Sequence, residues 1–288
     1  MITNMKFNLK FSLLFWLVIL SFFTRFGVGY TLGDQNIENE WGILVNNLIN
    51  YKSFSFYKID DQIIPSVYMP PMYPFFLYFI KIITFEKVNF VNLIIFAQII
   101  LSTYSVYIFY QLNQKIFSEK LSLINSFIFS FFPLNLYVAG QISSISLQVF
   151  LSLLFLKYFF LLTEHQSRKN LIMFSIVSGM LILTRGEFIL IFIITLFYLI
   201  FCKKIKFEIL IKVIVIVSLI ISPYIIRNYF TFNEIVIVKS SGFNLWKGNN
   251  QMSLVEGATS VHPPNTFEEE QWKALKKPEF KNLKSKLE

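Results

Sequence analysis

Three carboxylates stand close together in the polar stretch TLGDQNIENEWGILVNNLINYKSFSF, which follows the first apolar run of the chain. They are Asp34, Glu38 and Glu40. A carboxylate at the mouth of a cavity can act as a general base towards an acceptor hydroxyl or amine. The stretch from Glu40 is also predicted to be helical, because apolar residues recur there at three- and four-residue spacing, at Trp41, Leu44, Val45, Leu48 and Ile49. An acid at the start of such a helix stabilises the helix dipole. Glu38 fits both roles equally, whereas Asp34 and Glu40 directly follow a membrane helix and favour the chemical role.

Three basic residues could bind a phosphate group. Arg185 lies in LTRGEF, Arg227 in SPYIIRNY and Lys247 in NLWKGNN. A guanidinium suits phosphate because its planar fork donates parallel hydrogen bonds to two oxygens. Structural alternatives remain open. The side chain of each arginine could simply extend to the membrane–water interface, and Arg185 could form an ion pair there with Glu187. Lys247 could be a plain surface charge.

The composition is that of an integral membrane protein. Of 288 residues, 55% are hydrophobic and 15% charged, and mean hydropathy is +0.58. A soluble domain carries about 25% charged residues. The net charge of +9 does not indicate nucleic acid, because the lysines and arginines mostly occupy short connectors between apolar runs and no nucleic-acid-binding motif is present.

Metal and disulfide chemistry find little support in the sequence. The single cysteine, Cys202, excludes an internal disulfide framework and a cysteine-built metal site. The two histidines, His165 and His262, stand far apart in the chain. We therefore predict no cofactor, and a divalent metal is not supported.

A span needs roughly 20 apolar residues, or about 17 at the short end. Eight runs are candidates, of which 171–184 and 188–202 are short and are predicted to form a tight hairpin that turns at Arg185-Gly186-Glu187 on the outer side. The eight runs are Leu9–Tyr30, Tyr68–Phe85, Phe90–Leu112, Leu121–Val138, Ser143–Leu162, Leu171–Thr184, Phe188–Cys202 and Phe207–Ile226. Four basic regions flank them and are cytoplasmic by the positive-inside rule. These regions contain Lys6 and Lys10, Lys115 and Lys120, Arg168 and Lys169, and the KKIK motif at 203–206.

The acidic stretch 31–67 is predicted to be external, so an odd number of crossings separates it from Lys115. Two apolar runs lie between them, and one therefore does not span. We choose 68–85, which begins YMPPMYP and carries Lys81, because neighbouring prolines disfavour helix. The prediction is an all-α polytopic membrane protein of about seven transmembrane helices, with its N-terminus inside and a juxtamembrane helix over 68–85 on the outer side.

Residues 1–228 thus form one transmembrane module, and 229–288 form an external C-terminal segment. The loop 31–67, the PPMYP turn, the connector 133–144, the Arg185-Gly186-Glu187 turn and the NLWKGNN stretch all fall on the outer side. Polar groups at this depth are costly unless they line a cavity. We therefore expect an external cavity at the level of the lipid headgroups.

The order of these elements resembles the GT-C superfamily of membrane glycosyltransferases. The similar branch contains the protein O-mannosyltransferases and the lipid A aminoarabinose transferases, especially their bacterial relatives. The resemblance runs from about Gly33 to Gly257 and rests on the external acidic loop, PPMYP, LTRGE, SPYIIRNY and NLWKGNN in that order. The seven predicted spans agree with the seven-helix module of that superfamily.

The resemblance implies a site as well as a fold. In the family the first external loop carries the catalytic carboxylate, a role that falls here to Asp34 or Glu40. The donor is a polyprenyl-phosphate sugar, and the acceptor is a lipid, glycan or protein outside a bacterial cytoplasmic (inner) membrane. The other residues implied to contact sugar or phosphate are Glu38, Tyr73, Arg185, Arg227, Asn228, Trp246, Lys247, Asn249 and Asn250.

Two features depart from the family pattern. Many relatives carry a second acid after the third helix, but this connector reads AGQISSISLQ, with Ile145 near the expected place. Gln141 and Gln148 can form hydrogen bonds but cannot act as bases. Family members also continue into more helices and an external domain. The resemblance therefore implies a fragment, a natural short form or half of a split protein.

Two other functions are considered. A catalytically inactive subunit would hold a lipid-linked sugar or a partner enzyme without turnover, as the missing acid suggests. A transporter of lipid-linked sugars would favour broken helices and polar residues at mid-membrane. The middle of the predicted spans is nearly free of charge, so transport is ranked last.

Overall fold

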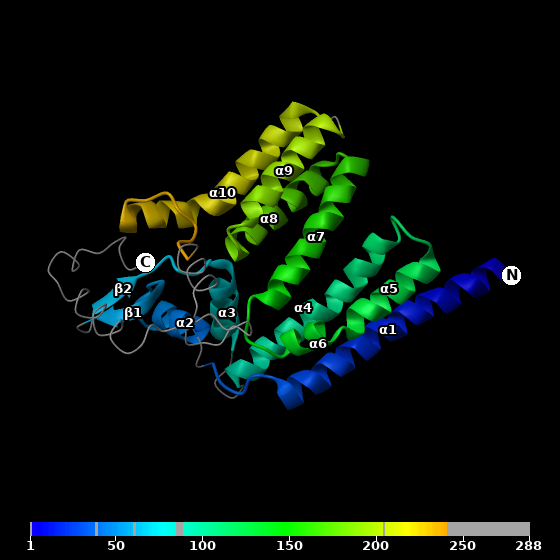
Figure 1. The fold of residues 1–288 in the computed structure, drawn as a ribbon, viewed down its shortest axis with the longest axis horizontal. Helices are drawn as coiled ribbons and strands as arrows, with labels where there is room; N and C mark the ends of the chain where they lie inside the picture. Colours follow the sequence, from blue (N-terminus) through cyan, green and yellow to red (C-terminus); the bar gives the residue numbers. More distant parts are fainter. Residues whose placement is uncertain (1, 38–39, 60–61, 85–88, 204, 241–288) are drawn as a thin grey trace, which may run out of the picture. The chain divides into compact units, whose positions relative to one another are not determined.

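The computed structural model describes residues 2–37, 40–59, 62–84, 89–203 and 205–240 (Figure 1). Its contacts divide the chain into two compact units. Unit 1 comprises residues up to 45 together with 71–221, and unit 2 comprises 46–70 together with the residues from 222 on. The described residues are mostly helical, which confirms the predicted all-α class, and unit 2 adds one small β-hairpin.

The helices and strands follow one another in a simple order. They are α1 (Ile2–Leu32), α2 (Glu40–Tyr51), β1 (Ser55–Ile59), β2 (Gln62–Pro65), α3 (Met72–Ile83), α4 (Phe90–Asn113), α5 (Glu119–Phe131), α6 (Pro133–Ala139), α7 (Ile145–Glu164), α8 (Arg168–Thr184), α9 (Phe188–Phe201) and α10 (Phe207–Phe232).

Among the described helices, four are long and apolar enough to cross a bilayer, namely α1, α4, α7 and α10. The pair α5 and α6 makes a fifth if it is one bent span. Their many exposed large apolar side chains suit contact with lipid. Helices α8 and α9 have 17 and 14 residues, fewer than the 18 residues that a candidate span has here. The polytopic class is therefore confirmed, and the total of seven spans stays a prediction.

The run 121–138, predicted as one span, is instead broken at Pro133. Helix α5 ends at Phe131, and α6 leaves it at an angle of 54°. The reason is local. In a continuous helix the carbonyl of Phe129 would accept the amide of residue 133, and proline has none. The side chain of Asn135 supplies the missing donor, since its Nδ2 lies 3.1 Å from Phe129 O.

Small residues allow the helices of unit 1 to pack closely. Figure 1 shows α1, α4 and α5 side by side, and α7 lies against α4 and α8. The face of α5 that is buried carries Ser122, Ser126 and Ser130, one per turn. Small side chains are preferred between membrane helices because lipid provides no hydrophobic drive and the backbones must approach closely.

A buried arginine lies within α1, a feature that the sequence analysis overlooked. Arg25 is 0% exposed. Its Nε donates to Ser102 Oγ on α4 at 2.8 Å, and its Nη1 donates to the carbonyl and hydroxyl of Ser21 and, at 3.5 Å, to Ser130 Oγ on α5. None of these partners is a carboxylate, and Nη2 has no hydrogen-bond partner within the described residues. This charge joins three helices inside the membrane module.

Unit 2 contains the hairpin and the end of α10. Strands β1 and β2 pair antiparallel, with Tyr57 opposite Ile64 and Ile59 opposite Gln62. The predicted external loop was expected to be helical, and its helix is confirmed as α2, but the hairpin was missed. Its sequence signal was a pair of aspartates between two runs rich in aromatic and β-branched residues.

Candidate active site

The carboxylate of Asp34 is held in place by backbone groups. The residue follows α1 directly and is half-buried. Its amide donates to the carbonyl of Gly140 at 3.0 Å, and the amide of Ile142 donates to Asp34 Oδ2 at 2.7 Å. Within the described residues, Oδ1 makes no hydrogen bond. One oxygen is therefore fixed while the other can accept a proton from a substrate.

Three glycines make this arrangement possible. A Cβ on Gly140 would lie 3.0 Å from Gly29 Cα and 3.2 Å from Gly33 Cα, and a Cβ on Gly33 would lie 3.0 Å from Gly140 O. Backbone atoms at the end of α1 and at the end of α6 therefore lie in close contact. The two backbone hydrogen bonds of Asp34, with Gly140 and Ile142, lie next to this contact.

A series of side-chain hydrogen bonds also fixes the connector between α6 and α7. Gln141 Nε2 donates to Leu32 O at 2.9 Å, and Gln98 Nε2 donates to Gln141 O at 2.7 Å. The hydroxyl of Tyr73 on α3 then donates to Gln98 Oε1 at 2.6 Å. Trp41 of α2 packs its ring edge-to-face against Tyr73 at 4.9 Å between centroids. Four elements of unit 1 thus meet around Asp34.

Tyr73 is a buried member of this network, with 1% of its surface exposed. Burial raises the pKa of its phenol well above 10, and the nearby charge of Asp34 raises it further. Both effects act against the phenolate. The hydroxyl therefore stays protonated near neutral pH and acts as a donor to Gln98. The predicted contact of Tyr73 with substrate stays a prediction.

The structure does not join the second candidate base to this network. Glu40 is exposed and begins α2, where its charge suits the helix dipole. No contact links Glu40 to Asp34 among the described residues. Glu38 lies outside the described residues. Of the two described carboxylates, Asp34 is the one that the structure places among fixed polar groups.

Arg185 lies at the turn between α8 and α9, as predicted. Its Nη1 lies 3.4 Å from Glu187 Oε1, and both side chains are well exposed. This is the pair that the structural alternative for Arg185 expects, and exposed ion pairs contribute only about 0–1 kcal/mol. Arg185 is therefore paired weakly enough to exchange this partner for a phosphate.

Arg227 and Asn228, in unit 2, are surrounded by the protein itself. Arg227 Nη1 donates to Ser66 O at 3.0 Å and to Asn228 Oδ1 at 2.7 Å, and Nη2 donates to Phe54 O at 3.0 Å. The guanidinium also faces the rings of Phe54, Tyr224 and Phe232. Asn228 is 0% exposed and donates to Val236 O at 2.7 Å. Both residues fasten segments of unit 2 to the end of α10.

The other predicted contacts cannot be placed. Trp246, Lys247, Asn249 and Asn250 lie outside the described residues. Within the described residues, no group of three His, Cys, Asp or Glu side chains could hold a metal ion. The structural members that sequence reasoning missed are Gln98 and Trp41. Gln98 carried a signal, since a polar side chain in the middle of an apolar span usually has a specific partner.

Replacing Gly140 by alanine tests the close approach. We expect the added methyl group to push α1 from α6, lower stability by about 1–3 kcal/mol and weaken the hold on Asp34. Gly27→Ala is the matched control, because a Cβ at Gly27 meets nothing within 4 Å. Thermal unfolding in detergent measures the change in stability. Equal behaviour of the two variants would contradict the glycine contact.

Comparison with known proteins gives one result. The family model described as Dolichyl-phosphate-mannose-protein mannosyltransferase matches residues 69–226, more than half of the chain. Tyr73, Gln98, Gly140 and Arg185 lie inside the matched range, whereas Asp34 lies before it. No curated protein and no solved structure matches the chain.

Proposed function

Because the chain belongs to the dolichyl-phosphate-mannose-protein mannosyltransferase family, and so to the GT-C membrane glycosyltransferases, we propose that it uses a polyprenyl-phosphate sugar. The sugar passes to a hydroxyl or amine of a lipid, glycan or protein on the outer side of the membrane. The bacterial cytoplasmic membrane is the proposed location.

The observation that carries this proposal is the anchored carboxylate of Asp34. Its Oδ2 accepts the amide of Ile142, so the group is oriented without being neutralised by a cation among the described residues. In the proposed step, Asp34 Oδ1 takes the proton of the acceptor group. The acceptor atom attacks the anomeric carbon, and the bond from that carbon to the phosphate oxygen breaks. The polyprenyl phosphate leaves with the electron pair and needs no proton near neutral pH.

The departing phosphate needs positive charge. Arg185 is an exposed cation in one of the predicted outer turns, and Lys247 remains a second predicted contact. Preorganised cations of this kind stabilise charge that develops in the transition state. Arg227 stays a predicted phosphate ligand, although its nitrogens already serve two backbone carbonyls.

Two sets of contacts support the proposed sidedness. Lys115 Nζ lies 2.6 Å from Glu164 Oε1, which places the α4–α5 and α7–α8 connectors at one end of unit 1. Asp34 bonds to Gly140 and Ile142, which places the loop after α1 and the α6–α7 connector together. Both pairings agree with the assignment of basic connectors to the cytoplasm and of Asp34 to the outer side.

The test is a transfer assay. The purified chain is reconstituted in phosphatidylcholine vesicles with a mixture of radiolabelled polyprenyl-phosphate sugars and a membrane extract as acceptor. We expect loss of one donor and transfer of its label to the extract. Binding of a donor without consumption would favour the inactive binding subunit. If the chain neither binds nor consumes any of the donors, the proposed donor class is wrong.

A further inference from the structure

One peptide group lies between Asp34 and the buried side chains of unit 1. It joins Gln141 to Ile142 in the connector between α6 and α7. Its N–H donates to Asp34 Oδ2 at 2.7 Å, and its C=O accepts a hydrogen bond from Gln98 Nε2 at 2.7 Å. Among the described residues no peptide bond is cis, so this N–H and this C=O point in opposite directions. Gln98 and Asp34 therefore hold opposite edges of one planar group.

The side chain of Gln98 continues the same direction of donation. Because the carbonyl of Gln141 can only accept, Gln98 must turn its NH₂ group towards it. The Oε1 atom of Gln98 then faces the hydroxyl of Tyr73, which donates to it at 2.6 Å. Donation thus runs from the Tyr73 hydroxyl through the Gln98 amide and the 141–142 peptide to the carboxylate of Asp34. Amides that accept and donate in line polarise one another, so each bond strengthens the next.

The far end of this hydrogen-bond chain is fixed by burial. Tyr73 is 1% exposed and Gln98 is 0% exposed. The ring of Trp41 packs edge-to-face against Tyr73 and holds the phenol in place. Burial and the charge of Asp34 both raise the pKa of the Tyr73 phenol, so the phenol keeps the proton that it donates.

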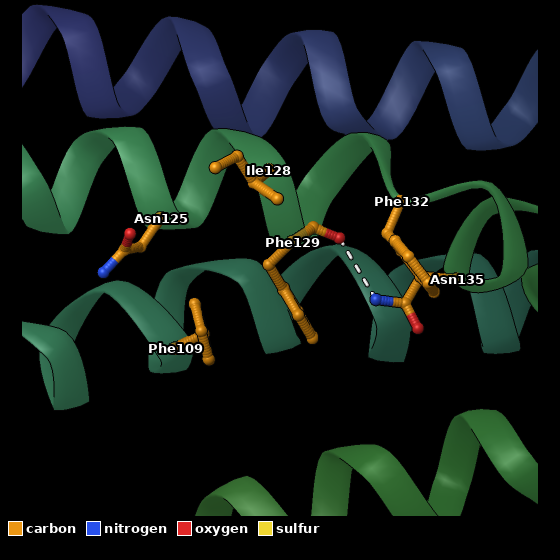
Figure 2. Close-up of a pocket in the computed structure, with 6 residues that line it drawn as sticks. All are labelled: Phe109, Asn125, Ile128, Phe129, Phe132 and Asn135. Atoms are coloured by element: carbon orange, nitrogen blue, oxygen red, sulfur yellow. Dashed lines mark hydrogen bonds between the residues drawn. The ribbon is translucent and has the colours of Figure 1, made fainter.

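The connector is held from the side of α6 as well. Asn135 Nδ2 donates to Phe129 O at 3.1 Å and ties the start of α6 to α5, as the dashed line in Figure 2 shows. At the other end of α6, the amide of Gln141 donates to Val138 O at 3.2 Å. These bonds fix where the connector begins but leave the 141–142 peptide plane free to rotate. The bond from Gln98 removes that rotation.

We propose that Tyr73 and Gln98 are positioning residues that orient the carboxylate of Asp34 through the 141–142 peptide, an inference that rests on the proposed function. Asp34 can take the acceptor proton on Oδ1 only while Oδ2 stays on the amide of Ile142. A misplacement of 1 Å at a reacting group can lower a rate by about 10². This role for Tyr73 differs from the predicted contact with sugar or phosphate.

Hydrogen exchange of the Ile142 amide tests this hydrogen-bond chain without any sugar donor. Tyr73→Phe removes only the hydroxyl, and Gln98→Met keeps the length of the side chain but neither of its hydrogen bonds. Tyr137→Phe is the matched control, because Tyr137 lies on α6 near the same connector and is 49% exposed. The full-length protein in phosphatidylcholine nanodiscs is exchanged and digested, and peptides that cover residues 139–146 are fragmented to resolve single amides by mass spectrometry.

We expect the Ile142 amide to exchange about fivefold faster in Tyr73→Phe, or about 1 kcal/mol, which is the usual contribution of one hydrogen bond. Gln98→Met should speed exchange at least as much, and Tyr137→Phe should behave as the wild type. Unchanged exchange in Tyr73→Phe overturns the inference, whether or not Gln98→Met folds.

Transfer kinetics test the positioning role. Tyr73→Phe should lower kcat about fivefold and leave KM for the donor unchanged, because the contacts that bind the donor remain. In the Asp34→Asn background, Tyr73→Phe should cause no further loss, since its effect passes through the missing carboxylate. An unchanged kcat in Tyr73→Phe, or an equal further loss in the Asp34→Asn background, overturns the positioning role.

The two proposals fail differently. If the wild type transfers no sugar but Ile142 exchanges faster in Tyr73→Phe, the hydrogen-bond chain to Asp34 stands and the proposed function fails. If transfer depends on Asp34 while neither exchange nor kcat responds to Tyr73→Phe, the proposed function stands and the positioning role is wrong.

Discussion

Asp34→Asn should lower the rate of sugar transfer by about 10²–10⁴ while leaving the protein folded. The asparagine carbonyl can still accept the amide of Ile142, which now bonds to Asp34 Oδ2. What is lost is the ability to take the acceptor proton. Initial rates of label transfer under saturating donor, with thermal unfolding in parallel, separate loss of chemistry from loss of fold.

Glu40→Gln is the matched control for this result. Glu40 is exposed at the start of α2, so its neutralisation should cost a few tenths of a kcal/mol in helix stability and leave the rate nearly unchanged. Full activity in Asp34→Asn would refute the assigned base. A large loss in Glu40→Gln instead would move the role to Glu40.

Arg227→Met should destabilise unit 2 by about 2–6 kcal/mol, because the carbonyls of Ser66 and Phe54 lose a charged donor and such losses cost about 1–3 kcal/mol each. The aromatic rings that face the guanidinium lose their cation as well. Limited proteolysis between residues 52 and 70, followed by mass spectrometry, should show faster cleavage in the variant.

Two further variants decide whether Arg227 serves to hold the carbonyls of Ser66 and Phe54 or to bind a phosphate. Arg227→Lys keeps the charge, but a lysine cannot donate to both carbonyls. If the role of Arg227 is structural, this variant should be cleaved as fast as Arg227→Met. If its role is to bind phosphate, Arg227→Lys should largely restore binding. Arg185→Met removes an exposed cation and should leave proteolysis unchanged, since surface substitutions are usually within about 0.5 kcal/mol. Normal proteolysis of Arg227→Met with a raised KM for donor would show that phosphate binding is its main role.

The sequence predicted the elements well where local pattern decides structure. Apolar runs became helices, the periodic stretch after Glu40 became α2, and the turn at Arg185 separated α8 from α9. The break at Pro133 and the hairpin were missed, although each had a local signal. Pro133 lies in a run whose average hydropathy is that of a single membrane span. The hairpin lies in a stretch whose polar composition is that of a loop.

The site was predicted only in part, because its partners are not readable as side-chain types. Asp34 and Glu40 were both predicted from their place after a membrane helix, and the sequence did not decide between them. The carboxylate of Asp34 accepts a hydrogen bond from the backbone amide of Ile142, and that contact depends on three glycines in two distant segments. Backbone partners leave no trace in residue type. Gln98 and Tyr73 reach the same connector through distances set by tertiary packing, which spacing along the chain does not encode.

The buried Arg25 has a consequence for how the protein enters the membrane. An arginine at the centre of an isolated inserting helix costs about 2.5–3.5 kcal/mol. The hydroxyls from other helices that accept its hydrogen bonds belong to residues 77 and 105 positions later in the chain. During synthesis, α1 must therefore wait for α4 and α5 to emerge before its charge is accommodated. Biogenesis of this chain should depend on the insertion machinery retaining its first helix until α5 has emerged.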